Sequence, residues 1–305
     1  MLFTPMLQKK DRKIHMRRMM HALRLTLTVS ITAVAITFLP ALLYADSGRE
    51  FPPEHRENKV VEKKEPTEGE QRFERALGSD EKSKFTPHKL NYGVFGSKEA
   101  LMQISFKYRL IRDWGLYLAF TNLVKWDIYA KSTPYHDINF MPELFYRFNP
   151  ENEWFFSVDT GYWHKSNGRD GTEDRGWDQL FVRFHKLFRF KSVDLAWETQ
   201  VYYELGTSEE NRDIGEYLGW WDTGLSVIDL LPTKNSNIDL EFFLWSGEGG
   251  NPFQAGQYRV GIMYKMKYVA FQPAIYLQYF NGYGEVIIDY DKRSEGLRAG
   301  LAFLY

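Results

Sequence analysis

The sequence contains no cysteine, which excludes disulfide bonds and thiolate metal sites but remains compatible with an oxidising compartment. A strong net charge is also absent, because 39 lysines and arginines face 40 aspartates and glutamates. A near-neutral chain has no overall attraction to nucleic acid, so no nucleic-acid partner is expected. After residue 90, no segment has the unbroken apolar length of a membrane-spanning helix.

The N-terminus carries many basic residues, followed by an apolar stretch from Leu25 to Leu43 and the small residue Ala45. This order predicts a secretory signal peptide over residues 1–45. The alternative is an uncleaved membrane anchor, because nineteen apolar residues are long enough to span a bilayer. The basic region is long, which favours a later translation start at Met16, Met19 or Met20.

Residues 46–89 are rich in Glu, Lys, Arg and Pro and poor in apolar residues, which predicts a largely disordered periplasmic segment. From residue 90 to 305 the pattern changes to alternation with a period of two. For example, Ile104 and Phe106 alternate with Ser105 and Lys107. Such alternation is typical of β-strands that have one apolar and one polar face.

Twelve strands of this kind can be counted, and the connections between them alternate between short and long. A β-sandwich would also alternate, but here the apolar face is almost wholly large and aromatic, and aromatic residues make up 17% of the chain. Short turns opposite long loops are the organisation of an outer-membrane barrel. The sequence therefore predicts an all-β fold: a 12-stranded antiparallel transmembrane β-barrel over residues 90–305.

Such a barrel must close, because an open sheet edge in hydrocarbon leaves backbone groups unpaired. Wide water-filled pores are built from about sixteen strands, so we expect a polar, filled interior instead. The inward charged side chains that could pair there are Lys107, Glu143, Arg147, Asp159, Arg183, Asp194, Glu198, Asp222, Asp239, Glu241 and Arg259.

The stretch YWHKSNGRDGTEDRGWD, residues 162–178, places polar groups on the face predicted to meet lipid. His164 and Ser166 continue the outward series of their strand, and Asp178 is outward on the next strand. Histidine, serine and aspartate side chains can act as general base, nucleophile and orienting group, respectively. Polar side chains at strand ends are often only interfacial, but polar groups facing lipid are costly, which favours a functional cause.

The motif His164-x-Ser166-Asn167-Gly168-Arg169, followed by Arg175-x-Trp177, resembles the signature of the outer-membrane phospholipase A family. The resemblance covers the chain from about residue 90 to its end, with further agreement at Asn91-Tyr92, Pro142, Leu144-Phe145, Gly282-Tyr283-Gly284-Glu285 and Ile288-Asp289-Tyr290. It implies a barrel in the outer membrane of a Gram-negative bacterium that hydrolyses acyl esters of phospholipids. It also implies dependence on Ca²⁺ and activity as a homodimer.

Carried over to this sequence, the resemblance implies Ser166 as nucleophile and His164 as general base. Asp178 occupies the third position, where the family has asparagine. The backbone N–H groups of Ser166 and Gly168 would hold the oxyanion. The implied calcium ligands are the Arg169 carbonyl, Asp174 in place of the family's serine, and Ser132 from a second copy of the chain.

Two alternatives remain open from the sequence. Asp178 in place of asparagine keeps open a catalytically degenerate structural or binding barrel, and a small channel is the third reading. The other histidines are expected to be structural: His185 in the barrel interior, His136 in an external loop, and His55 and His88 in or beside the disordered segment.

Overall fold

The computed structural model describes residues 84–111, 114–149, 156–190, 193–231, 236–266 and 273–303, together with residues 73, 74 and 77. The signal peptide expected over residues 1–45 and most of the segment 46–89 lie outside the described residues. Among the residues that are described, no helix is both long and apolar enough to cross a bilayer.

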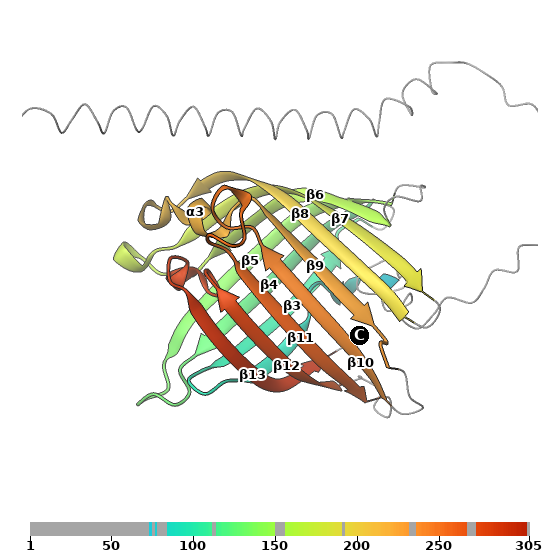
Figure 1. Cartoon of the computed structure of the whole chain (residues 1–305). Helices are drawn as coiled ribbons and strands as arrows, with labels where there is room; N and C mark the ends of the chain where they lie inside the picture. Colours follow the sequence, from blue (N-terminus) through green and yellow to red (C-terminus); the bar gives the residue numbers. More distant parts are fainter. Residues whose placement is uncertain are drawn as a thin grey trace, which may run out of the picture. The chain divides into compact units, whose positions relative to one another are not determined.

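Antiparallel strands close into a barrel, as predicted (Figure 1). Strands β2 to β13 each pair with the next strand along the chain, and β13 (Ser294–Phe303) pairs back with β2 (Asn91–Phe95). The strands between them are β3 (Ala100–Arg109), β4 (Leu116–Trp126), β5 (Tyr135–Phe148), β6 (Ser157–Ser166), β7 (Gly176–Phe190), β8 (Val193–Thr207), β9 (Trp221–Ile228), β10 (Ser236–Trp245), β11 (Gln257–Met266) and β12 (Pro273–Gly282).

An additional short strand, β1 (Phe85–Pro87), pairs with β3 beyond the end of β2. Strand β4 occupies the opposite edge of β3 along its whole length, so β1 and β2 share one edge. Because β1 and β2 together fill one strand position around the barrel, the thirteen strands of the sheet form a twelve-stranded barrel. Strand β1 lies within the segment 46–89, so residues 85–87 of that segment pair with the barrel.

The connections alternate between the two ends of the barrel, because successive strands are antiparallel. The longer connections after β6, β8, β10 and β12 lie at one end, as the sequence predicts. They contain the short helices η1 (Gly171–Glu173), η2 (Glu209–Asn211), α3 (Ile214–Leu218), η3 (Glu248–Gly250) and η4 (Ile287–Asp289).

Each strand separates an apolar outer face from a polar inner face. Along β3, the side chain of Ile104 is largely exposed, whereas Ser105 and Lys107 are almost completely buried. The same division holds at Leu144 and Leu180, which are exposed on β5 and β7. A soluble protein would bury these apolar groups, so the outer face is suited to lipid.

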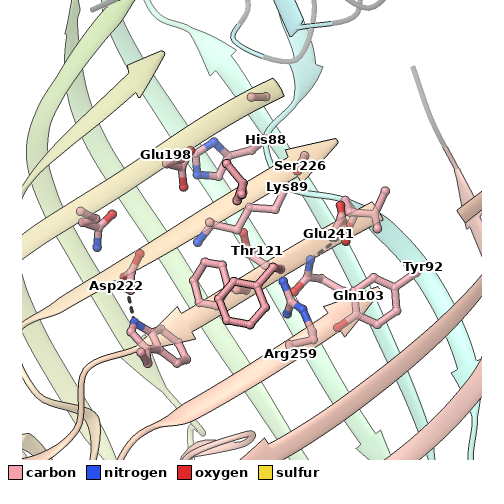
Figure 2. A pocket seen from close by; sticks show the side chains of 18 of the residues that line it. His88, Lys89, Tyr92, Gln103, Thr121, Glu198, Asp222, Ser226, Glu241 and Arg259 are labelled. Carbon is pink, nitrogen blue, oxygen red and sulfur yellow. Dashed lines mark hydrogen bonds between the residues drawn. The ribbon is translucent and has the colours of Figure 1, made fainter. Parts of the chain in front are cut away.

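Charged side chains fill the interior, as predicted, and they pair with one another. The Glu143 carboxylate lies 2.9 Å from His88, Lys89 and Arg183. His88, expected in or beside a disordered segment, is instead buried inside the barrel. A cavity of about 360 Å³ remains among these groups, and Lys89, Glu198, Asp222, Glu241 and Arg259 are among the residues that line it (Figure 2).

The loop between β12 and β13, residues 283–293, packs into one end of the barrel. Val286 and Ile287 are completely buried. The Glu285 carboxylate pairs with Arg298 at 2.6 Å and with Lys125 at 3.1 Å. This β12–β13 loop therefore belongs to the interior, and it lies at the same end as the β6–β7 connection.

Candidate active site

The hairpin of β6 and β7 sets the register of the candidate residues. His164 pairs directly with Asp178, and Ser166 pairs with Gly176. Trp163 and Lys165 are buried in the interior, so His164 and Ser166, which alternate with them, project outward. The three residues predicted from the sequence thus lie on the outer surface at the loop end of one hairpin.

The His164 imidazole and the Asp178 carboxylate are hydrogen-bonded, with 2.7 Å between Nδ1 and Oδ1. A carboxylate can only accept, so the proton of the neutral imidazole lies on Nδ1 and Nε2 remains free to act as an acceptor. The two side chains are 30% and 35% exposed, so bulk solvent screens the pair only in part. Asp178 thereby fixes the tautomer that a general base requires.

Tyr162 is a third member of this group, and the sequence predicted no role for it. It precedes His164 by two residues on the same outer face, and its hydroxyl donates a hydrogen bond to Asp178 Oδ1. The Asp178 oxygen that contacts the imidazole therefore also accepts from a phenol. The alternating pattern already placed Tyr162 beside His164, but the bond to the next strand had no sequence signal.

Ser166 is half-buried at the end of β6. Its side chain shares a face with His164, and residues two apart on a strand are separated by about 6.7 Å along it. Among the described residues, no hydrogen bond joins the Ser166 hydroxyl to the imidazole. The predicted nucleophile and the predicted base are therefore neighbours on one surface, and catalytic hydrogen bonds often form only when substrate is bound.

Pro142 on β5 interrupts the ladder beside the histidine. Pairing of β5 with β6 runs from Phe148 to Glu143 and resumes only at Phe140, opposite Ser166. Proline has no backbone N–H to donate, so the strand next to His164 cannot continue its hydrogen bonds there.

The loop after Ser166, residues 167–175, is organised by the buried side chain of Asn167. Its Oδ1 accepts the backbone N–H groups of Arg169 at 3.3 Å and Arg175 at 3.1 Å. Its Nδ2 donates to the Glu173 carbonyl at 2.9 Å. One side chain thus ties both ends of the loop together, which the motif alone did not reveal.

Gly168 lies in the left-handed region with φ of 65°, a conformation that favours glycine. A Cβ atom at this position would also approach the ring of Phe140 to 3.4 Å. The glycine therefore lets the chain turn immediately after Ser166. The role predicted for the backbone N–H groups of Ser166 and Gly168 in binding an oxyanion stays a prediction.

Of the residues predicted to bind calcium, Arg169 and Asp174 lie in the 167–175 loop, and exposed Ser132 lies in the loop between β4 and β5. No group of three or more His, Asp or Glu side chains within the described ranges is arranged to hold a metal ion. The predicted donors are all oxygen atoms, however, which is the ligand type that Ca²⁺ takes. Asp174 follows η1 directly, and its backbone N–H donates to the Gly171 carbonyl.

A polar contact connects this loop to the β12–β13 loop. The Arg169 guanidinium donates to the His136 carbonyl at 2.6 Å, and the His136 ring lies 2.5 Å from Asp289. Burial works to raise the pKa of Asp289, but hydrogen bonds from Lys292 and His136 outweigh it and hold that pKa below its ordinary value. Asp289 is therefore a carboxylate that can pair with His136, a histidine whose contact the sequence did not predict.

The model of the phospholipase A1 family matches residues 73–303. The chain belongs to the phospholipase A1 family. Phospholipase A1 of Salmonella typhimurium strain LT2 is 28% identical over an alignment of 171 positions, which covers 53% of this chain and 52% of that protein. Phospholipase A1 of Escherichia coli strain K12 is 28% identical over 169 residues, again 53% and 52%. The chain thus spans about half the length of these curated relatives.

Solved structures of the family share the fold. Outer membrane phospholipase A from Escherichia coli superimposes with a TM-score of 0.63 at 20% identity, covering 75% of this chain and 97% of that chain. The Salmonella typhi outer membrane phospholipase dimer with bound calcium gives a TM-score of 0.61 at 22% identity, covering 75% and 95%. The twelve-stranded barrel is therefore also the architecture of these solved structures.

Proposed function

We propose that this chain hydrolyses the acyl esters of membrane phospholipids at the bacterial outer membrane, as an enzyme of phospholipase A1/A2 and lysophospholipase type. The observation that carries the proposal is the outward pair of His164 and Asp178, with 2.7 Å between Nδ1 and Oδ1, beside Ser166. Family membership supports the reaction class. The exposed apolar side chains around the hairpin, such as Leu180, support a site that faces lipid.

In the proposed mechanism, the Ser166 hydroxyl attacks the ester carbonyl while His164 Nε2 takes its proton. Asp178 keeps the imidazole oriented and stabilises the imidazolium that forms. The backbone N–H groups of Ser166 and Gly168 hold the negative oxygen of the tetrahedral intermediate. His164 then protonates the leaving alcohol, and water hydrolyses the acyl-enzyme with His164 again as base, releasing the fatty acid.

The donor set proposed for Ca²⁺ is the Arg169 carbonyl, the Asp174 carboxylate and Ser132 of a second copy of the chain. When bound there, Ca²⁺ supplies positive charge close to the developing oxyanion. Arg169 and Asp174 share the loop that Asn167 holds together. Completion of the site by a second chain would link activity to homodimer formation, which protects the membrane from uncontrolled hydrolysis.

The direct test is fatty-acid release by the refolded full chain from phospholipid in mixed detergent micelles. With Ca²⁺ we expect steady release, and with a chelator we expect a rate about 100-fold lower, the size of effect seen when oxyanion stabilisation is lost. Mg²⁺ should not restore the rate, because it requires near-ideal octahedral geometry. Absence of release with Ca²⁺ present would reject the proposed function, and full release in chelator would reject only the calcium role.

Replacing Asn167 by alanine should lower kcat about tenfold, because the loop loses three hydrogen bonds that hold its two ends together. Asn167→Asp is the matched control, since it keeps the acceptor for Arg169 and Arg175 and loses only the donor to Glu173. Initial rates and trypsin cleavage within the loop would be measured together. A rate for Asn167→Ala within twofold of the parent would show that other contacts hold the loop.

A further inference from the structure

The hydroxyl of Tyr162 lies against the carboxylate that orients the proposed base. It donates to Asp178 Oδ1, the same oxygen that lies 2.7 Å from His164 Nδ1. Tyr162 and His164 are two residues apart on the outer face of β6, and Asp178 faces them from β7. The three side chains therefore form a continuous chain from phenol to carboxylate to imidazole on the lipid side of the barrel.

We propose that Tyr162 is a positioning residue of the catalytic group, which holds the Asp178 carboxylate in the orientation that aligns His164 for Ser166. This inference rests on the proposed function and adds a residue to it. A carboxylate on a partly apolar surface keeps its charge at lower cost when a hydroxyl donates to it. Asp178 Oδ1 accepts from both the Tyr162 hydroxyl and His164 Nδ1, so holding the carboxylate in place also holds the imidazole ring in place.

Within the part of the chain that the structure describes, only β6 supplies side chains that contact Asp178. On β8, the residue paired with Asp178 is Gly206, which has no side chain. On β6, the titratable groups that contact Asp178 are Tyr162 and His164. Across the described residues, the Asp178 side chain is hydrogen-bonded to these two, so removal of the phenol leaves the carboxylate held by the histidine alone.

The carboxylate at position 178 gives Tyr162 a specific importance in this chain. The resemblance implies asparagine at this position, and an amide carries no charge that needs stabilising beside lipid. A carboxylate does carry such a charge, and a charge-assisted hydrogen bond is about twice as strong as a neutral one. The contribution of Tyr162 should therefore depend on whether residue 178 is Asp or Asn.

The experiment compares Tyr162→Phe in two backgrounds, the parent and Asp178→Asn. In the parent, Tyr162→Phe should lower kcat about tenfold with KM within about twofold, because a hydrogen bond to a charged group is lost. In the Asp178→Asn background, the same change should alter kcat by less than about threefold.

Tyr203→Phe is the matched control, because Tyr203 is an exposed tyrosine on the outer face of the neighbouring strand β8. It should leave both kcat and KM unchanged. Equal effects of Tyr162→Phe in the two backgrounds, or no effect in the parent, would overturn the proposal.

A second measurement separates this proposal from the proposed function. In the Ser166→Ala variant with isotope-labelled histidine, the low-field Nδ1–H signal of His164 is identified by its loss in His164→Asn. Tyr162→Phe should shift this signal, and an unchanged signal would overturn the positioning role. If the parent releases no fatty acid, the proposed function fails, while the signal still decides whether Tyr162 orients the pair.

Discussion

Replacing Ser166 with alanine is expected to lower fatty-acid release from phospholipid by about 10³-fold or more. The hydroxyl oxygen is the proposed nucleophile, and alanine retains only the Cβ atom. Within the described part of the chain, the Ser166 side chain makes no hydrogen bond, and the residue is only half-buried. The free energy of unfolding should therefore change by no more than about 0.5 kcal/mol.

The control for this variant is Ser157→Ala, on the same strand but on its inner face. The Ser157 side chain is buried, and its hydroxyl has no hydrogen-bond partner among the residues that the structure describes. Both variants should show the electrophoretic shift of a folded barrel, and only Ser166→Ala should lose hydrolysis. A rate for Ser166→Ala near that of the parent would mean that the nucleophile lies elsewhere.

The fold could be predicted because barrel strands carry a local signal. Exposed Ile104 and buried Lys107 on β3 follow directly from alternation, and the requirement for closure then fixes the topology. Strand β1 was not predicted, because three residues in a polar segment are too few to show a period. Its pairing with β3 depends on a partner more than fifteen residues away.

The core of the candidate site could also be predicted from the sequence, because the hairpin brings residues at a fixed spacing into contact. His164 and Asp178 face each other across β6 and β7, and alternation gives the side of the barrel. The contact of His136 with Asp289 could not be predicted, because it joins residues 153 positions apart through a loop with no periodic pattern. Burial of His88 beside Glu143 had no local signal for the same reason.

The second large effect is expected in the interior, at Asp159. Its carboxylate accepts two hydrogen bonds of 2.6 Å from Arg147 and lies 3.0 Å from His185. The side chain is completely buried. Asp159→Ala removes the anion and leaves the Arg147 guanidinium buried without its compensating charge. We expect the free energy of unfolding to fall by about 3–5 kcal/mol.

Urea unfolding of the parent and the variant in the same detergent would measure this difference. Ser157→Ala, two residues away on the same strand, is the control. Ser157 is equally buried on the same inner face, but its hydroxyl bonds to none of the described residues, so its replacement leaves no buried charge uncompensated and should be nearly neutral. Asp159→Asn should fall between the two, because the amide keeps one acceptor for Arg147 but carries no charge. A loss below about 1 kcal/mol for Asp159→Ala would mean that water entering from the interior cavity solvates the guanidinium, and that the barrel does not depend on this ion pair.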